Sequence, residues 1–406
     1  MLDFAILGGG ISGISIGRLL DLKKSFSYQI FEAEKKPGGL CRSEIIDGHV
    51  LDIGGGHFLC TKYPDVYDFI FSHIPKTEFN YFDRVSKIAV SNTTIDYPIE
   101  SNIWQLPIAN QVKYLISVAR AGEVNGKKEP TNYSEWILWK LGVEISRQYM
   151  EPYNKKIWGV SPAEMDIDWL HKIPRLDIQD IFKASLSKEN SLDKFPSHQG
   201  FYYPKVGGFQ SIFDSIYEKV KHNVSLETKI TKLEWNGQYW LINNSIKAKK
   251  IINTIPWPVI YKANGEPDNL TESVAKLKSN SLVVSLYESD YSHNYHWQYI
   301  PEESINHHRE FYVHNFAPHS KSNTLYTETN IKRWKSGTLL GKAKPLYEHV
   351  NEYAYPIPVL GHAKAAAEVI NYYHKINMYG LGRWGQWQYY NSDVCIKQAI
   401  DLVEKL

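Results

Sequence analysis

Cysteine is scarce in this chain of 406 residues, which contains only Cys41, Cys60 and Cys395. Thiols this far apart in sequence are too few for a disulfide framework or a cysteine-based metal cluster, which excludes small disulfide-stapled secreted domains. The first residues read as a strand containing Asp3 rather than as a basic signal-peptide region. We therefore expect a reducing, cytoplasmic setting and no bound metal.

The chain also lacks long apolar runs and a dominant charge. No segment approaches the roughly 18–20 consecutive apolar residues that cross a bilayer as a helix. The 46 Lys and Arg residues nearly balance the 44 Asp and Glu residues, which leaves a formal net charge of +2. Such a balance creates no strong field that would draw the protein to nucleic acid or to anionic lipid. We expect neither an integral membrane segment nor a nucleic-acid partner.

Aromatic side chains, in contrast, are abundant, with 28 Tyr and 12 Trp. Their apolar rings and polar tips suit the binding of bases and sugars, although a tyrosine-rich core and surface is the simpler alternative. An apolar fraction of 43% and a charged fraction of 22% are typical of globular proteins. The length exceeds what one compact core accommodates, so we expect two or three intertwined domains.

Residues 1–32 contain the strongest local motif. An apolar strand precedes Gly8, Gly10 and Gly13, which have the spacing G-x-G-x-x-G, and an apolar stripe at helical period follows them. The first glycine permits a tight turn, the second lets a pyrophosphate approach the backbone, and the third lets helix and strand pack closely. A second strand ends on Glu32, which is placed to accept hydrogen bonds from a ribose. This arrangement predicts a dinucleotide site; a glycine-rich turn without a ligand is the alternative.

The next segment favours FAD over a nicotinamide cofactor. A nicotinamide domain normally returns here to a third parallel strand, but residues 37–43 form a glycine-rich loop with Arg42, and residues 52–57 read D-x-G-G-x-H. Both loops resemble those of a large flavoprotein group that contains amine oxidases, protoporphyrinogen oxidases and UDP-galactopyranose mutases, where they run along the flavin. Arg42 either pairs with the pyrophosphate or is an ordinary surface charge.

The rest of the chain contains helical and strand patterns. Helices are expected at residues 65–73, 110–121, 133–149 and 210–221. A hairpin is expected from residues 85–90 and 94–97, with its turn at 91–92. Residues 251–254 read as a returning strand of the first sheet, and a substrate-side sheet collects residues 281–286, 295–300, 310–313 and 324–328. A C-terminal helix begins near Asn391 and Asp393, both good N-cap candidates, and its positive end could point at a flavin.

Residues 150–162 are the second informative stretch. Prolines at both ends bracket Tyr153, Asn154 and Trp158, and neither a helix nor a strand accounts for the pattern. Side chains of these types can stack on a flat ring and hydrogen-bond to it.

Five separated stretches, taken in order, resemble the UDP-galactopyranose mutases. Residues 55–57 resemble the GGH loop on the flavin, and residues 97–102 resemble the YPFQNN motif of the eukaryotic-type branch. Residues 151–158 resemble RPYNFKVW. The run R-x5-N-x2-P at residues 309–318 resembles part of the sugar-nucleotide cleft, and residues 382–393 resemble the flavin-contacting C-terminal signature. The resemblance covers nearly the whole chain, although related oxidases share the first and last motifs.

This resemblance implies an α/β protein in which a Rossmann-type FAD-binding domain carries an inserted helical cap and an antiparallel β-sheet substrate domain. We expect a discontinuous FAD-binding domain at residues 1–95, 200–260 and 360–406. The mainly helical cap would span residues 96–199, and the sheet domain residues 261–359.

The resemblance also implies roles by position. Residues that would contact FAD come from the glycine-rich loops and the C-terminal signature: Gly8, Gly10, Ile11, Ser12, Gly13, Glu32, Ala33, Gly39, Leu40, Arg42, Gly55, Gly56, His57, Gly382, Arg383, Tyr390, Asn391 and Ser392. Residues that would act in catalysis or hold the diphosphate are His57, Lys172, Arg175, Arg309 and Tyr389. Residues that would contact the rest of the substrate are Tyr97, Glu100, Asn154, Trp158, Tyr202, Tyr203 and Asn315.

Departures from the family pattern leave questions open. Glu100 stands where an amide is expected to read uracil, so the base is in doubt. Either Lys172 or Arg175 would be the first diphosphate cation. Asn391 takes the place of an Asp found in part of the family.

The implied activity is the interconversion of pyranose and furanose forms of a nucleoside-diphosphate hexose, for cell-surface polysaccharide biosynthesis, without net redox change. In the family, N5 of reduced FAD attacks the anomeric carbon and displaces the nucleoside diphosphate. NAD(P)H is a candidate external reductant, and a homodimer is a candidate assembly. The first alternative is an FAD-dependent oxidoreductase of the amine oxidase or protoporphyrinogen oxidase type. The second is a non-catalytic binding protein like the GDP-dissociation inhibitors, which the intact glycine motif and Glu32 disfavour.

Overall fold

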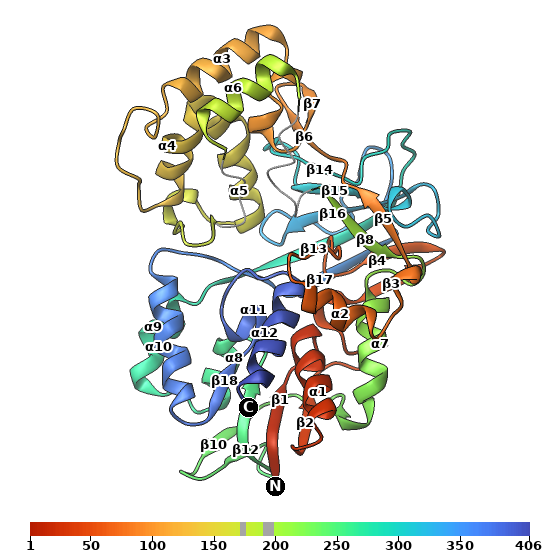
Figure 1. Cartoon of the computed structure of the whole chain (residues 1–406), viewed down its shortest axis with the longest axis vertical. Coiled ribbons are helices and arrows are strands. Elements are labelled where there is room, and N and C mark those ends of the chain that lie inside the picture. The colour runs from red at the N-terminus through yellow and green to blue at the C-terminus, as the bar shows by residue number, and fades with distance from the viewer. Residues whose placement is uncertain (171–175, 190–198) are drawn as a thin grey trace.

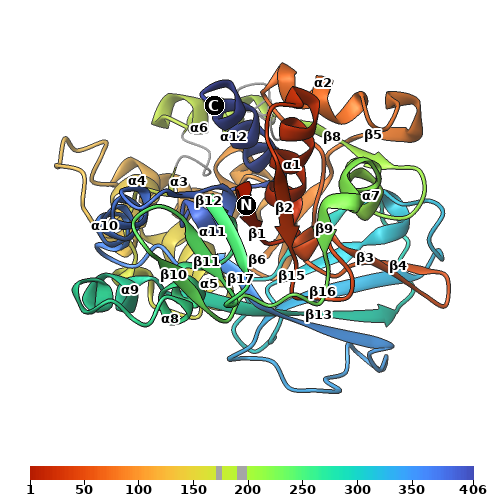
Figure 2. The same cartoon turned by 90° about the horizontal axis from the view of Figure 1, so that it is seen from below.

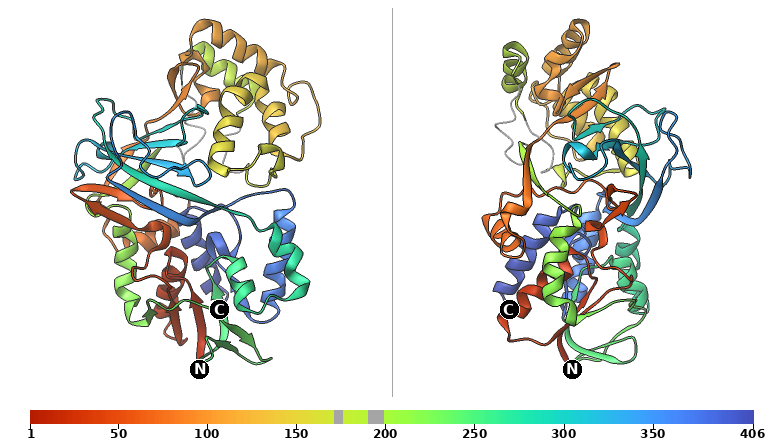
Figure 3. Two further views of the ribbon diagram at one scale, coloured as in Figure 1. Left: turned by 180° about the vertical axis from the view of Figure 1, so that it is seen from behind. Right: turned by 90° about the vertical axis from the view of Figure 1, so that its right-hand side faces the viewer.

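The protein consists of a lower body built on a mainly parallel sheet, a second sheet across the middle and a group of helices at the top (Figure 1). The computed structural model describes residues 1–170, 176–189 and 199–406. From behind and from the side, the helical group lies at the opposite end of the molecule from both termini (Figure 3). The expected fold class, a Rossmann-type body with an inserted helical group and a second sheet, is confirmed.

The first sheet forms around β1 (Leu2–Leu7), which runs parallel to both of its neighbours. Its strand order is β10 (Leu233–Trp235), β11 (Trp240–Ile242), β12 (Ile246–Asn253), β1, β2 (Tyr28–Phe31) and β9 (Val224–Ser225), and β18 (Met378–Gly380) also pairs with β12. Segments from the beginning, middle and end of the chain thus meet in one sheet.

Helices cover both faces of this sheet (Figure 2). They are α1 (Ile11–Lys23), α7 (Gln210–Val220) and α12 (Ser392–Glu404) on one face, and α8 (Trp257–Ala263), α9 (Thr271–Lys276) and α10 (His362–His374) on the other. Phe4 and Ile6 pack into the first of these cores, whereas Ala5 and Leu7, which point the other way, pack into the second. A strand that is buried on both faces reads as a continuous apolar run, which explains the signal in residues 4–7.

The second sheet is antiparallel except for one strand pair. Its order is β17 (Tyr347–Pro356), β13 (Ser279–Glu288), β16 (Thr324–Asn330), β15 (Arg309–Tyr312), β14 (Trp297–Tyr299), β6 (Ser86–Val90) and β7 (Thr93–Asp96). The predicted hairpin is β6 and β7, and β6 runs parallel to β14. The hairpin therefore belongs to the second sheet. The expected domain boundary at residue 95 would assign most of it to the FAD-binding domain. Two-stranded sheets are formed by β3 (Ser43–Ile46) with β4 (His49–Asp52) and by β5 (Phe79–Asp83) with β8 (Gly200–Pro204).

The helical group consists of α3 (Ile108–Ala119), α4 (Tyr133–Ile145), α5 (Glu151–Trp158) and α6 (Ile178–Ser187), with a π-helical turn at Ser146–Met150. The expectation that no helix fits residues 150–162 is wrong, because α5 occupies most of this stretch. Pro152 lies in the first turn of α5, directly after the π-helical turn Ser146–Met150, so the chain is already helical before the proline. Gly159 ends the helix with a φ of +69°.

Two short helices complete the fold, α2 (Pro64–Phe71) and α11 (Gly382–Gly385). In the part of the chain that the structure describes, no helix combines the length and the apolar character needed to cross a bilayer.

Candidate functional site

The glycines after β1 shape the N-terminal end of α1. Gly8 has a φ of +103°, and a Cβ atom on Gly13 would lie 2.0 Å from the carbonyl oxygen of Gly8. A Cβ atom on Gly10, in contrast, would meet no atom within 4 Å. Gly10 is also the N-cap residue of α1, and no side chain caps the helix there. The first N–H groups of α1 therefore face open space, which is the arrangement that binds a phosphate.

Glu32 directly follows β2 and lies beside the glycine turn after β1. Its carboxylate accepts hydrogen bonds from the N–H of Gly9 at 2.7 Å and from the N–H of Glu34 at 2.9 Å. A carboxylate has about four lone-pair positions, so it can still accept a ribose hydroxyl. The second glycine loop joins the first, because the N–H of Gly38 donates to the carbonyl of Gly9 at 2.9 Å. Arg42 follows this loop and donates through Nε to the carbonyl of Gly39 at 3.3 Å.

The turn after β4 is tightly enclosed. A Cβ atom on Gly55 would lie 2.1 Å from Oε1 of Glu328, and one on Gly56 would lie 2.2 Å from the ring of Phe311. Nδ1 of His57 lies 2.9 Å from the carbonyl oxygen of Gly55. Burial, together with nearby Arg383, lowers the pKa of His57 to about 4. The imidazole is therefore neutral at physiological pH.

A cleft of about 810 Å³ opens where the helical group, the second sheet and the N-terminal end of α12 meet. The predicted site residues that line it are Gly56, His57, Tyr97, Glu100, Asn154, Trp158, Arg309, Arg383, Tyr389, Tyr390, Asn391 and Ser392. These residues come from segments far apart in sequence, so the fold brings 12 of the 29 predicted site residues together in one cleft.

Aromatic rings form much of the cleft wall. Tyr97 and Tyr299 lie 5.2 Å apart between ring centroids, and Tyr355 and Tyr389 lie 4.7 Å apart. Trp158 stands edge-on to Tyr389 at 5.7 Å. Burial is the main cause that raises the pKa of Tyr97, Tyr355 and Tyr389. The phenols therefore stay protonated and can donate hydrogen bonds to a ligand.

Among the residues that the structure describes, three guanidinium groups line the same cleft, those of Arg84, Arg309 and Arg383. Arg84 donates to Oγ of Ser86 at 2.9 Å and to the hydroxyl of Tyr299 at 3.2 Å. Arg383 donates to backbone carbonyls of residues 354 and 390. Within the described residues, neither Arg84 nor Arg383 forms an ion pair with a carboxylate. Their positive charge is therefore available to an anionic ligand.

Arg309 has a different setting because it forms an ion pair with Glu328. Nε of Arg309 donates to Oε2 of Glu328 at 2.9 Å, and its Nη2 donates to the same oxygen. The other oxygen of Glu328 accepts the N–H of Gly56 at 3.0 Å. Burial alone would raise the pKa of Glu328, but Arg309 and His308 lower it to about 2. Glu328 thus connects the cleft cation to the turn that contains His57, and leaves Nη1 of Arg309 outside the pair.

Glu100 is the second buried carboxylate at the cleft. It lies in the 3₁₀ turn Ile99–Ser101 and is only 4% exposed. Burial raises the pKa of Glu100 to about 7, although a hydrogen bond from its own backbone and the more distant Lys140 act in the other direction.

Helix α5 presents Asn154 and Trp158 to the cleft. Nδ2 of Asn154 donates to the carbonyl of Met150 at 2.8 Å, and its Oδ1 accepts the indole N–H of Trp158 at 3.1 Å. The amide therefore fixes the indole ring at the cleft.

The C-terminal signature returns to α1. A Cβ atom on Gly382, which has a φ of +74°, would lie 2.0 Å from Oγ of Ser12. Asn391 is the N-cap residue of α12, and Ser392 begins the helix at the edge of the cleft. The positive end of α12 therefore faces the cleft; that it points at a flavin stays a prediction.

Some predicted residues lie elsewhere. The hydroxyl of Tyr203 donates to Asp52 at 2.8 Å in the core, and the ring of Tyr202 packs against Tyr67 and Phe71. Nδ2 of Asn315 donates to the carbonyls of His293 and Tyr295. Tyr202, Tyr203 and Asn315 are absent from the cleft lining. Lys172 and Arg175 lie outside the described residues.

Sequence reasoning missed several cleft residues, notably Arg84, Tyr299 and Tyr355. The fold alone brings them together, since they come from the β5–β6 connection, β14 and β17. The described residues contain no group of three or more His, Cys, Asp or Glu side chains arranged to hold a metal ion.

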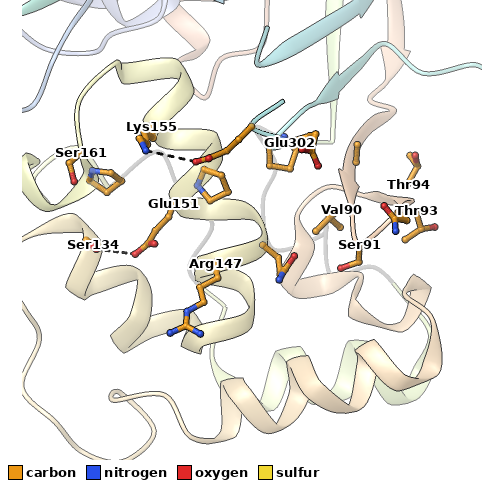
Figure 4. Close-up of a pocket in the computed structure, with 17 residues that line it drawn as sticks. Val90, Ser91, Thr93, Thr94, Ser134, Arg147, Glu151, Lys155, Ser161 and Glu302 are labelled. Carbon is orange, nitrogen blue, oxygen red and sulfur yellow. Dashed lines mark hydrogen bonds and ion pairs between the residues drawn. The ribbon is translucent and has the colours of Figure 1, made fainter. Parts of the chain in front are cut away.

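A second hollow of about 990 Å³ lies against the other face of α5 (Figure 4). Its charged groups are engaged with one another or exposed. Oγ of Ser134 donates to Glu151 at 3.0 Å, Nζ of Lys155 lies 3.9 Å from Glu303, and Arg147 is exposed. Glu151 and Arg147 of this hollow are therefore close in sequence to cleft residues such as Asn154, but they lie outside the cleft.

The chain is similar to known proteins in both sequence and structure. The family described as NAD(P)-binding Rossmann-like domain matches residues 6–71. A UDP-galactopyranose mutase solved in its reduced state superimposes with a TM-score of 0.89 at 21% identity, over 100% of this chain and 93% of that one. The chain has the fold of UDP-galactopyranose mutase. The resemblance inferred from the sequence motifs is therefore confirmed at the level of fold.

Sequence comparison with curated proteins gives partial matches to mutases. The chain is 25% identical to dTDP-fucopyranose mutase from Escherichia coli, over 42% of this chain and 45% of the relative. It is 24% identical to UDP-galactopyranose mutase from Mycoplasma pneumoniae, over 62% of this chain and 61% of the relative. The alignments thus span about half to three-fifths of these relatives, whereas the structural similarity extends over the whole chain.

Proposed function

We propose that this protein is an FAD-dependent nucleotide-sugar mutase that interconverts pyranose and furanose forms of a nucleoside-diphosphate hexose. The observation that carries the proposal is the cleft in which Arg84, Arg309 and Arg383 face a wall of tyrosines beside the His57 turn. Guanidinium groups suit a diphosphate, because their planar forks match phosphate oxygens. A base and a sugar need aromatic faces and hydroxyl donors. The furanose product would serve cell-surface polysaccharide synthesis in the cytoplasm.

The residues around α1 and α12 fit FAD. The open position at Gly10 and the uncapped N–H groups of α1 would hold the pyrophosphate, and Glu32 would hold a ribose. Gly56, His57 and the N-terminal end of α12 would border the isoalloxazine ring. When bound and reduced, by NAD(P)H or another donor, FAD would supply a nucleophilic nitrogen for the anomeric carbon.

The chain's own residues would position the substrate and retain the leaving group. Arg84 and Arg309 would hold the diphosphate after its bond to the sugar breaks, so that the same phosphate can return to the anomeric carbon. The phenols of Tyr355 and Tyr389 would donate hydrogen bonds to phosphate or sugar oxygens. His57 would pack against the flavin as a neutral ring, because its lowered pKa removes the positive charge that would repel the nearby arginines.

The cleft disfavours an amine oxidase. An amine oxidase binds a cationic or apolar amine. The guanidinium groups of Arg84, Arg309 and Arg383 would repel a cationic amine, and they would have to lose water to contact an apolar one. A non-catalytic binding protein would not need an open phosphate position at Gly10.

The test is conversion of nucleotide sugars by the purified, FAD-loaded protein. We expect the dithionite-reduced protein to equilibrate at least one nucleoside-diphosphate hexopyranose with its furanose form, as resolved by chromatography over a panel of sugars and bases. The oxidised protein should convert none, because oxidised flavin lacks the nucleophilic nitrogen. Peroxide release with an amine substrate, and no conversion of any nucleotide sugar by the reduced protein, would instead establish an oxidase.

A further inference from the structure

Glu100 is a buried carboxylate for which the described residues supply no side-chain partner. It is 4% exposed and lines the cleft. Apart from its own backbone N–H, its carboxylate forms no hydrogen bond or ion pair with the residues that the structure describes. Lys140, a cation that acts electrostatically on Glu100, is itself held by Glu123 at 2.6 Å. Burying a charged or polar group without partners is unfavourable, so this site gains free energy from any ligand that donates hydrogen bonds to it.

The surroundings of Glu100 suit a flat ring. Tyr97, Tyr133, Tyr149 and Trp158 line the same cleft. The three tyrosines have electrostatic contact with Glu100, and burial raises the pKa of each of them, so they remain neutral. The titratable groups that act on the carboxylate come from three places. Tyr133 and Lys140 belong to α4, Tyr149 belongs to the π-helical turn, and Tyr97 precedes Glu100 in the chain. Glu100 is therefore a hydrogen-bond acceptor beside several aromatic rings of the cleft.

Nucleobases differ in the donors that they offer to such an acceptor. The Watson–Crick edge of guanine carries two adjacent donors, N1–H and N2–H, whose spacing matches the two oxygens of a carboxylate. Uracil and thymine carry one N–H between two carbonyl oxygens, which an ionised carboxylate repels. Cytosine and adenine carry an amino group beside a ring nitrogen that accepts. Guanine is thus the base that satisfies both oxygens of Glu100.

We propose that Glu100 selects a guanine nucleotide and accepts N1–H and N2–H of the base with its two carboxylate oxygens. This inference rests on the proposed function, since it names the nucleotide that the mutase cleft takes. The aromatic side chains around Glu100 would stack on the purine, and the diphosphate would extend toward Arg84 and Arg309.

The test is calorimetric titration of the FAD-loaded protein with GDP, UDP, dTDP and CDP. We expect GDP to bind about tenfold or more tightly than any of the pyrimidine nucleotides, which is the discrimination that a bidentate base contact provides. Glu100→Gln replaces one acceptor with a donor, so GDP should lose about tenfold in affinity while UDP gains. Glu151→Gln, which changes a carboxylate in the second hollow (Figure 4), should leave all four affinities unchanged.

The pH dependence provides a second readout. GDP requires the ionised carboxylate, so its affinity should rise from about pH 6 to about pH 8 in the wild type and stay level in Glu100→Gln. Tighter binding of UDP or dTDP than of GDP, or an unchanged preference in Glu100→Gln, would overturn this inference alone. Failure of every nucleoside diphosphate to bind would overturn the proposed function, and this inference with it.

Discussion

Replacement of Arg309 with alanine is expected to weaken nucleoside-diphosphate binding by about 2–5 kcal/mol, the range for loss of one partner of a buried charge pair. Arg309 lines the cleft, and Glu328 engages its Nε and Nη2, which leaves Nη1 for a phosphate. Titration calorimetry of the wild type and of Arg309→Ala would measure the difference directly.

The same substitution also affects folding, because Glu328 is fully buried and would lose its cation. An unpaired buried charge costs about 3–5 kcal/mol of folding free energy. The double variant Arg309→Ala/Glu328→Gln removes that charge, so it should recover thermal stability but not nucleotide affinity. This separation distinguishes a cation that holds the ligand from one that only stabilises the fold.

Arg147→Ala is the matched control for Arg309. Arg147 is an exposed arginine of the second hollow, so its removal should leave both nucleotide affinity and melting temperature unchanged. If the double variant bound nucleoside diphosphate as tightly as the wild type, Arg309 would have no place in the site.

Gly10→Ala is expected to abolish most FAD binding without unfolding the protein. The backbone at Gly10 has a φ of −79° and a ψ of −175°, which alanine adopts without strain, and its Cβ would meet no protein atom within 4 Å. The added methyl group would occupy the space through which the pyrophosphate approaches the backbone. Loss of one hydrogen bond to a charged group costs about 1.5–3 kcal/mol, or roughly tenfold to a hundredfold in affinity.

Gly13→Ala should behave in the opposite way. Its Cβ would lie 2.0 Å from the carbonyl oxygen of Gly8, so α1 must move away from β1 and the protein should lose about 1–3 kcal/mol of folding stability. Flavin absorbance per protein and the melting temperature of the apoprotein distinguish the two variants. Full flavin content in Gly10→Ala would contradict the assignment of the pyrophosphate to α1.

Local sequence signals predicted part of the fold well. The glycine spacing of residues 8–13 defines the turn between β1 and α1. Ser91 and Asn92, which both have a positive φ, define the turn of the hairpin. The prolines around α5 misled the interpretation, because Pro152 lies in the first turn of the helix, where it is tolerated. Strand β17 was not predicted. Its pattern of buried and exposed residues depends on its place at the edge of the second sheet, and only the tertiary structure defines that place.

The same division applies to the site. Residues within motifs, such as His57, Glu100 and Trp158, were predicted from the sequence and line the cleft. Arg84 belongs to no motif, and only the pairing of β6 with β14 brings it beside Tyr299. Sequence also could not show that Glu328, which is 19 residues from Arg309, sits opposite it across β15 and β16.

The most direct test of the central claim is a crystal structure of the reduced, FAD-loaded protein with a nucleoside-diphosphate hexopyranose. The claim is that one cleft holds both the flavin ring and the sugar, with the phosphates retained by arginine. We expect the diphosphate within hydrogen-bonding distance of Arg84 and Arg309, and the anomeric carbon facing the flavin beside His57. A diphosphate bound away from both arginines, with the sugar unable to reach the flavin, would contradict the account.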